Sequence, residues 1–298
     1  MTEYFNYNTN DVDIAMTAPG PLWSDFDINS KFSKQMIKAK EDNDDNYWTL
    51  MREVFAHDFQ TLPLERFKVW ASVNFIPLMS TNRNSNYIRI VLDAVSQDRI
   101  YFEALVENMI GLTSQDFNQF SMFNDFPTTM NRIQHLAHLI ICGYTPEALA
   151  KMDTIVELGA GIGEMADIVY KLGFKGKYII YDFPEVGKIQ KWYHDKSGLT
   201  NMVHTSDIDD LVGADLCIAT WSLTEMPFDL RDQVIGKIVD TKNWLIAYSN
   251  QIFGMDNAKY IAEDFVPQFT NHDIEYIDIP FMSWDGGTKY LTIKQHTS

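Results

Sequence analysis

The sequence is poor in cysteine and in long apolar runs, and each shortage excludes a class of protein. Only two of its 298 residues are cysteines, Cys142 and Cys217, and both lie inside apolar stretches. A secreted domain held by disulfides carries more, so we expect two buried thiols in a reducing, cytoplasmic setting. No apolar run approaches the ~18 residues of a membrane span, and the first residues lack the basic and apolar segments of a signal peptide.

Basic residues are also scarce. The chain has 24 lysines and arginines against 41 aspartates and glutamates, which gives a formal net charge of −17 at pH 7. Such a charge repels a polyanion. We therefore expect no nucleic-acid partner and no membrane partner. The composition leaves the oligomeric state open, a homo-oligomer included.

Glycine is absent between Gly20 and Gly111, where apolar residues recur at helical spacing. One such run falls on a single helix face: Tyr47, Leu50, Met51, Val54 and Phe55. The pattern predicts a mainly helical N-terminal region over residues 1–130, with 1–40 as an irregular arm, followed by a second unit over 131–298.

A glycine cluster, Gly159, Gly161 and Gly163, directly follows the apolar segment 154–158. The segment is β-branched and short, as expected for a parallel strand buried on both faces. Alternate glycines let the backbone turn sharply and approach a ligand without interference from a Cβ atom. Dinucleotide loops space their last two glycines three residues apart. Here the spacing is two and Glu164 follows, where a phosphate would meet a carboxylate.

A cationic ligand suits this loop better than a phosphate. S-adenosylmethionine has no phosphate and carries a sulfonium and an amino group, which Glu157 complements from just before the loop. A second apolar segment, 178–181, ends in Asp182 at about the interval expected for an acidic residue that binds ribose hydroxyls. Asp207 follows a third segment and is suited either to the adenine amine or to capping a turn.

Further apolar segments complete an α/β pattern. Strands are expected over 201–204, 215–219 and 243–248, then a helix over 257–265, then strands over 274–279 and 289–293 that flank Asp285-Gly286-Gly287, a hairpin signal. Alternating strands and helices closed by an antiparallel hairpin predict a seven-stranded, mostly parallel Rossmann-like methyltransferase sheet.

Three segments carry a closer resemblance: 178–186 with Gln190 and Tyr193 following, 219–226, and 246–250. In these segments the chain resembles the bacterial sugar O-methyltransferase family within the Rossmann-like methyltransferases. The resemblance covers roughly residues 131–293. It implies S-adenosylmethionine-dependent methyl transfer to a hydroxyl of a sugar or sugar-like compound, a small-molecule or glycan acceptor.

The chain departs from the family pattern in each segment. Phe183 replaces a leucine, Trp221 and Thr224 alter the segment after the fourth strand, and Ser249 is inserted before Asn250. We therefore expect an acceptor pocket that differs from the family's usual one. The complete predicted cofactor site consists of Glu157, Gly159, Ala160, Gly161, Gly163, Asp182, Phe183, Asp207, Ile208, Thr220 and Trp221.

Methyl transfer to a hydroxyl requires an oriented acceptor and a group that removes its proton. Glu225, after the fourth strand, is the first candidate for the base, although an acidic residue near a helix start has the same appearance. Asn250 is expected to orient the acceptor or Glu225, with a turn role as the alternative. His135 is a second candidate base. It lies three residues from His138, and the pair is more typical of a helix face than of a metal site, so we expect no metal. The acidic cluster of Asp207, Asp209 and Asp210 leaves a magnesium site for a diol acceptor as the alternative.

The helical region is expected to cover the open end of the sheet, because methyl transfer needs limited water. Arg132, His135 and Tyr144 precede the first core strand closely enough to face the pocket, and packing roles are equally consistent with the pattern. Trp221 and Trp284 offer flat faces for sugar C–H groups, or they belong to the core.

Two other functions compete with methyl transfer. One is a nicotinamide-dependent oxidoreductase on a similar sheet, which the glycine spacing and Glu164 disfavour. The other is a binding protein that kept the cofactor pocket and lost turnover, for which the altered segment after the fourth strand is the only hint.

Overall fold

The computed structural model describes residues 48–49, 51–53, 55–56, 130–279 and 287–296, and the structural statements below concern these residues. Within 48–56 the described residues are helical, and Met51 and Phe55 are fully buried. This agrees with the predicted apolar face. The remainder of the predicted N-terminal helical region lies outside the described residues.

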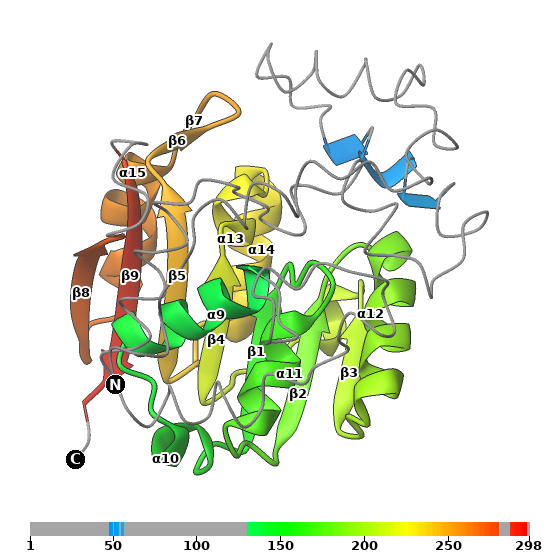
Figure 1. Cartoon of the computed structure of the whole chain (residues 1–298). Coiled ribbons are helices and arrows are strands. Elements are labelled where there is room, and N and C mark those ends of the chain that lie inside the picture. The colour runs from blue at the N-terminus through cyan, green and yellow to red at the C-terminus, as the bar shows by residue number, and fades with distance from the viewer. Residues whose placement is uncertain (1–47, 50, 54, 57–129, 280–286, 297–298) are drawn as a thin grey trace, which may run out of the picture.

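Seven strands form one mixed sheet (Figure 1), in the order β3-β2-β1-β4-β5-β9-β8. The strands are β1 (Thr154–Leu158), β2 (Lys177–Tyr181), β3 (Met202–Thr205), β4 (Leu216–Thr220), β5 (Asn243–Ser249), β8 (His272–Asp278) and β9 (Thr288–Gln295). The first five are parallel, and β9 runs antiparallel to both β5 and β8. The fold is that of the Rossmann-like methyltransferases. The predicted sheet and its closing antiparallel pair are confirmed.

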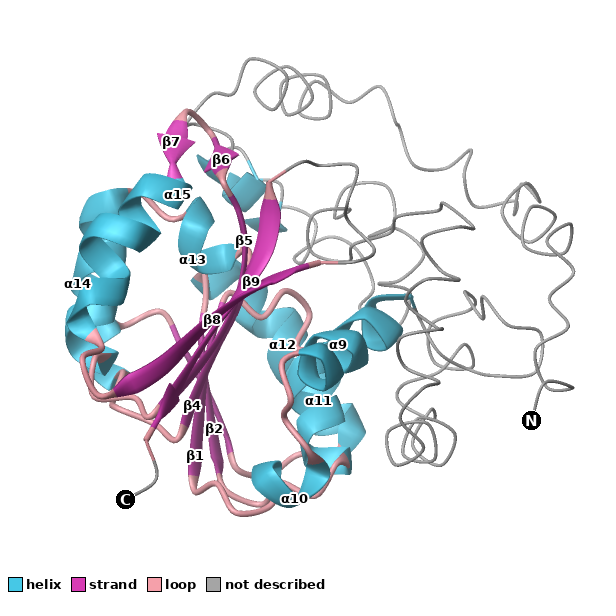
Figure 2. Ribbon diagram, turned by 90° about the vertical axis from the view of Figure 1, so that its left-hand side faces the viewer, coloured by secondary structure: helices cyan, strands magenta, loops and turns pink. Residues whose placement is uncertain are grey.

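Helices cover both faces of this sheet (Figure 2). α9 (Met130–Ile141), α11 (Glu164–Lys171) and α12 (Pro184–Ser197) lie on one face, and α14 (Phe228–Ile238) lies on the other. The shorter elements are α10 (Pro146–Leu149), η3 (Ile208–Asp210), α13 (Ser222–Glu225), β6 (Gln251–Ile252), β7 (Met255–Asp256), α15 (Asn257–Tyr260), η4 (Ile261–Phe265) and η5 (Val266–Gln268). The helix predicted over 257–265 is thus split into a short α-helix and a π-helical turn.

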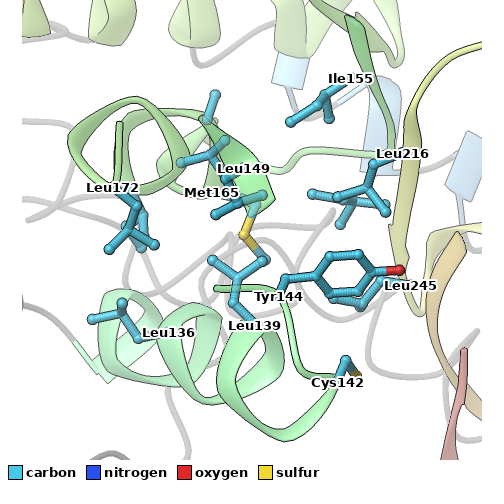
Figure 3. Packing of buried hydrophobic residues seen from close by; sticks show 14 of the residues in the cluster. Leu136, Leu139, Cys142, Tyr144, Leu149, Ile155, Met165, Leu172, Leu216 and Leu245 are labelled. Atoms are coloured by element: carbon cyan, nitrogen blue, oxygen red, sulfur yellow. The ribbon is translucent and has the colours of Figure 1, made fainter. Parts of the chain in front are cut away.

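Residues that alternate along each strand pack into two separate hydrophobic cores, one on each face of the sheet. Ile155, Leu216 and Leu245 pack with residues of α9 and α11 (Figure 3), whereas Val156 and Cys217 pack with residues of α14. Because both faces are covered, the central strands are mostly apolar, with Glu157 of β1 as a buried exception. Cys142 and Cys217 are both buried and unbridged, as predicted. None of the helices in the described part of the chain has the length and apolar character needed to cross a bilayer.

The order of the strands defines where a ligand binds in such a sheet. The chain proceeds outward from β1 to β2 and β3, then returns to the other side of β1 to form β4. Open α/β sheets bind ligands beyond the carboxyl ends of the strands at this kind of reversal. The carboxyl ends of β1 and β4 therefore mark the expected ligand site.

Candidate functional site

The loop from β1 to α11 has a backbone that demands glycine. Gly159, Gly161 and Gly163 have φ angles of 65°, 56° and 88°, all in the left-handed region. Side chains would also meet obstacles, because a Cβ at Gly159 would collide with Ser222 and one at Gly163 would collide with His194. The glycines that predicted a ligand loop are thus required by conformation at three positions and by space at two of them.

Asp182 follows β2 and is tied to the glycine loop. Its Oδ1 accepts a hydrogen bond from the N–H of Phe183 at 2.8 Å, and its Oδ2 accepts one from Nε2 of Gln190 at 2.7 Å. Nε2 of Gln190 also donates to the Gly161 carbonyl at 3.0 Å. Burial raises the pKa of Asp182 to about 6, against the opposing effect of these donors and of the N–H groups of Ala160 and Gly161. The structure therefore gives Asp182 a role in anchoring the loop.

Glu157 lies within β1 and is 1% exposed. Its Oε2 accepts a hydrogen bond from the Tyr178 hydroxyl at 2.9 Å. Burial, together with the charge of Asp182, raises the pKa of Glu157 to about 8. At neutral pH this carboxyl group is therefore mostly protonated, which corrects the simple expectation of a standing negative charge beside the loop.

Two histidines hold the far end of the glycine loop. His194 is buried, and its Nε2 donates to the Gly163 carbonyl at 2.9 Å, while its Nδ1 lies 2.7 Å from Nε2 of His204. Burial lowers the pKa of His194 and lowers that of His204 to about 4. Both rings are therefore neutral at pH 7, and Nδ1 of His194 accepts a hydrogen bond from Nε2 of His204. Sequence reasoning missed this pair because the two residues come from α12 and β3 and share no local pattern.

The described residues within 48–56, drawn blue in Figure 1, pack beside the start of α12. Arg52 donates two hydrogen bonds to the Glu185 carboxylate, at 3.1 and 3.0 Å, and its guanidinium lies 5.0 Å from the centre of the Phe183 ring. The Trp48 ring centre is 5.9 Å from that of Phe183. The described part of the N-terminal region thus lies at the rim of the predicted cofactor site, next to Asp182.

Asp207 caps the turn that it precedes. Its Oδ1 accepts a hydrogen bond from the Asp209 N–H at 2.9 Å, and the side chain is exposed. Of the two roles expected from the sequence, the structure provides the cap. Ile208 is half-buried and packs against the core on the α14 face. Contact of either residue with adenine stays a prediction.

The end of β4 carries backbone strain. Trp221, which follows Thr220, has a φ of 67°, a conformation that a residue with a Cβ rarely adopts and that is often found at functional sites. Its N–H donates to the Ala247 carbonyl at 2.7 Å. Oγ of Ser222 donates to the Leu158 carbonyl, which joins the ends of β4 and β1. Ser222 was not among the predicted site residues, since nothing local in the sequence shows that it faces Gly159.

The Trp221 ring packs against α9. It contacts His138 edge-on with ring centres 5.4 Å apart, and His138 lies 5.8 Å from His135. Nδ1 of His138 lies 2.5 Å from the Tyr290 hydroxyl, and burial lowers the pKa of His138. The structure thus places His138, and not the predicted His135, against Trp221 at the end of β4, while Trp221 combines a core contact with a position on the rim. Trp284 lies outside the described residues.

Arg132 and Tyr144 form hydrogen bonds inside the packed core. Arg132 is buried and donates to Asp167 at 2.5 Å and to the Tyr193 hydroxyl at 2.9 Å, which links α9 to α11 and α12. The Tyr144 hydroxyl donates to the carbonyl of Trp244, near the beginning of β5 and so at the opposite edge of the sheet. Of the two roles expected for these residues, the structure shows the packing contacts, and a role at the acceptor site stays a prediction. Among the described residues no three His, Cys, Asp or Glu side chains are grouped so that they could hold a metal ion.

Glu225 and Asn250 lie at the ends of neighbouring strands. Glu225 ends α13, directly after β4, and Asn250 follows β5, and both side chains are half-buried. The Asn250 N–H donates to the Gly287 carbonyl at 2.9 Å, and a Cβ at Gly287 would crowd the Asn250 side chain. Both candidates therefore belong to the carboxyl edge of the sheet, as predicted, and their catalytic roles stay predictions.

No family model matches the chain, and no curated protein matches it in sequence. Solved structures do resemble it. Ribosomal protein L11 methylase from Lactobacillus delbrueckii subsp. bulgaricus is 18% identical, with a TM-score of 0.39 and a match that covers 55% of this chain and 80% of that chain. An O-methyltransferase family protein from Burkholderia thailandensis is 12% identical, with a TM-score of 0.37 and coverage of 75% and 76%.

A third similar structure is that of mitomycin 7-O-methyltransferase, which is 12% identical, with a TM-score of 0.40 and coverage of 79% of this chain and 74% of that chain. Identities this low concern the fold alone. The cofactor, the acceptor and the reaction must therefore be argued from the residues of this chain.

Proposed function

We propose that this chain is an S-adenosylmethionine-dependent O-methyltransferase that acts on a hydroxyl of a sugar or sugar-like small molecule or glycan. The single observation that carries the proposal is the loop at the reversal of strand order, where three left-handed glycines meet the carboxyl groups of Glu157 and Asp182. This donor set fits a ligand with a sulfonium, an amino group and ribose hydroxyls. It does not fit a pyrophosphate, which the Asp182 carboxylate, ionised at neutral pH, would repel.

Each residue at this edge has a distinct proposed task. The loop from Gly159 to Gly163 lets the cofactor lie directly against the protein backbone. Glu157 ionises when the cofactor binds and faces its cationic groups, and Asp182 accepts hydrogen bonds from its ribose hydroxyls. Bound there, S-adenosylmethionine supplies an electrophilic methyl group. Glu225 removes the acceptor proton and Asn250 orients the acceptor hydroxyl. A positioned base of this kind contributes about 10²–10⁴-fold to the rate.

The sugar acceptor rests on the sequence resemblance and on the polar residues at the ends of β4 and β5. The test is methyl transfer from labelled S-adenosylmethionine to a panel of nucleotide sugars, free sugars and glycans. Label in a sugar product is the expected result. Cofactor binding without label in any acceptor would favour the binding protein without turnover, and hydride transfer with NAD would favour the oxidoreductase.

A further inference from the structure

A buried arginine on α14 lies behind the acceptor side of the site. Arg231 is 0% exposed, and no carboxylate among the described residues forms an ion pair with it. Its guanidinium lies between two rings instead, 4.8 Å from the centre of Phe228 and 4.5 Å from that of Tyr260. Hydrogen bonds and ring faces stabilise this buried cation, together with the nearby charge of Asp232, so the groups that it binds determine its position.

Two of those hydrogen bonds hold the backbone on either side of Glu225. Nη2 of Arg231 donates to the carbonyl of Thr224 at 3.0 Å and to the carbonyl of Met226 at 2.9 Å. These are the two residues on either side of Glu225. The backbone that carries the proposed base is therefore fixed from both sides by one nitrogen atom.

The same arginine reaches the end of β5 through a second residue. Nη1 of Arg231 donates to Oδ1 of Asn257 at 3.1 Å, and Nδ2 of Asn257 donates to the Ser249 carbonyl at 3.0 Å. The Asn257 N–H donates to the Asn250 carbonyl at 2.8 Å. Asn257 is 0% exposed, so water does not compete for these bonds. A continuous chain of hydrogen bonds thus connects the neighbours of Glu225 with the backbone of Asn250.

We propose that Arg231 and Asn257 are positioning residues that fix Glu225 and Asn250 relative to each other, and so fix the acceptor hydroxyl relative to the proposed base. The inference rests on the proposed function for its catalytic meaning. Its structural part, that the two segments are held together by this pair, does not depend on the reaction. We name the pair the acceptor clamp.

Two variants break the clamp at different bonds. Arg231→Lys keeps the charge but replaces a planar fork by a single ammonium, which cannot reach Asn257 and both carbonyls together. Asn257→Asp keeps the acceptor for Arg231 and replaces the donor to Ser249 by a second acceptor. Thr241→Val is the matched control, because Thr241 is 1% exposed and its Oγ1 accepts from the Ala214 N–H at the opposite edge of the sheet.

The first readout is hydrogen exchange in the full chain, which needs no acceptor. Both clamp variants should raise the exchange rates of amides in 221–226 and in 249–258 by about tenfold or more, while the control leaves these segments unchanged. Each variant should raise exchange in both segments, because the clamp joins them. Unchanged exchange in both variants, or a rise spread equally over the whole sheet, would overturn the proposal. Should Arg231→Lys fail to fold, Asn257→Asp alone decides.

The second readout separates positioning from general damage. Both clamp variants should lower kcat by about 10²-fold, since displacement of a catalytic group by about 1 Å has that effect, while the cofactor Kd stays within about twofold. A loss of cofactor affinity as large as the loss of kcat would contradict the clamp. If the wild-type protein neither binds S-adenosylmethionine nor transfers methyl, the proposed function fails, and the exchange experiment still decides whether the clamp exists.

Discussion

The two halves of the candidate site are built in different ways. At the ends of β1 and β2 the backbone sets the geometry, through three left-handed glycines and the carbonyl and N–H groups that Gln190, His194 and Asp182 bind. At the ends of β4 and β5 side chains set it, because Arg231 and Asn257 connect the neighbours of Glu225 with those of Asn250.

This difference predicts which half tolerates change. The cofactor is the same in every reaction, so a loop with a fixed backbone can bind it. The acceptor differs between enzymes, so its site is better built from side chains, which single substitutions can alter. Of the departures from the pattern of the family that the chain resembles, Trp221, Thr224 and Ser249 lie in the second half, and Phe183 lies in the first. Substitutions in the first half should therefore affect cofactor affinity, and substitutions in the second should affect turnover.

The largest expected effect is that of Glu225→Gln. The variant keeps the shape of the side chain and loses its capacity to accept a proton, so single-turnover methyl transfer should fall by about 10²–10⁴-fold with cofactor affinity unchanged. Asp229→Asn, an exposed position on α14, is the control and should retain full activity. Full turnover in Glu225→Gln would transfer the role of base to His135 or to placement alone.

Asp182→Ala should weaken cofactor binding with little effect on the methyl-transfer step. Two ribose hydroxyls would lose their acceptor, which costs about 1–3 kcal/mol of binding free energy in calorimetry. Asp195→Ala, at an exposed position on α12, is the control.

Asp182 also anchors the glycine loop, and a 2′-deoxy analogue of the cofactor product separates the two roles. The wild type should bind the analogue less tightly than the parent compound. The Asp182→Ala variant should bind the analogue and the parent compound with the same affinity, because it has already lost the ribose contact. Equal discrimination by both proteins would assign Asp182 to the loop alone.

The same contrast explains how much of the molecule the sequence predicts. The strands and the closing antiparallel pair follow from local periodicity and from residues with special backbone preferences. The glycine loop and Asp182 follow from spacing along the chain.

Other features depend on contacts between distant residues, which one sequence does not reveal. His194 with His204, Ser222 with Leu158, and Arg231 with Asn257 are separated by 10, 64 and 26 residues. The protonation of Glu157 depends on burial, which arises only once both faces of the sheet are covered. For the same reason the sequence did not decide whether Tyr144 faces the pocket or the core.

The smallest expected effect is a dependence of cofactor affinity on pH. Because the pKa of Glu157 is raised to about 8, the group is mostly neutral at pH 7, and a bound sulfonium favours its ionised form. Binding should therefore release a proton, and affinity should increase about tenfold between pH 7 and pH 8.5. Glu157→Gln should abolish this dependence. An equal dependence in wild type and variant would contradict the assignment.

Glu157 should also affect folding, with a sign fixed by its raised pKa. Between pH 4.5, the ordinary pKa of a glutamate, and about pH 8, Glu157 is protonated in the folded chain and ionised in the unfolded chain. This contribution to the free energy of unfolding therefore decreases as pH rises through that window. Denaturant titrations should show that Glu157→Gln removes this part of the decrease. A pH profile identical to that of the wild type would place Glu157 in a more solvated setting.

The most direct test of the central claim is a calorimetric titration of the full chain with S-adenosylmethionine and with NAD, repeated on Gly161→Val. Valine at a φ of 56° is strained and fills the approach to the loop, whereas Gly236→Ala, in open space on α14, is the matched control. The account predicts that S-adenosylmethionine binds the wild type and the control, that NAD does not bind, and that a folded Gly161→Val loses the cofactor. Binding of NAD, or undiminished affinity of Gly161→Val for S-adenosylmethionine, would contradict it.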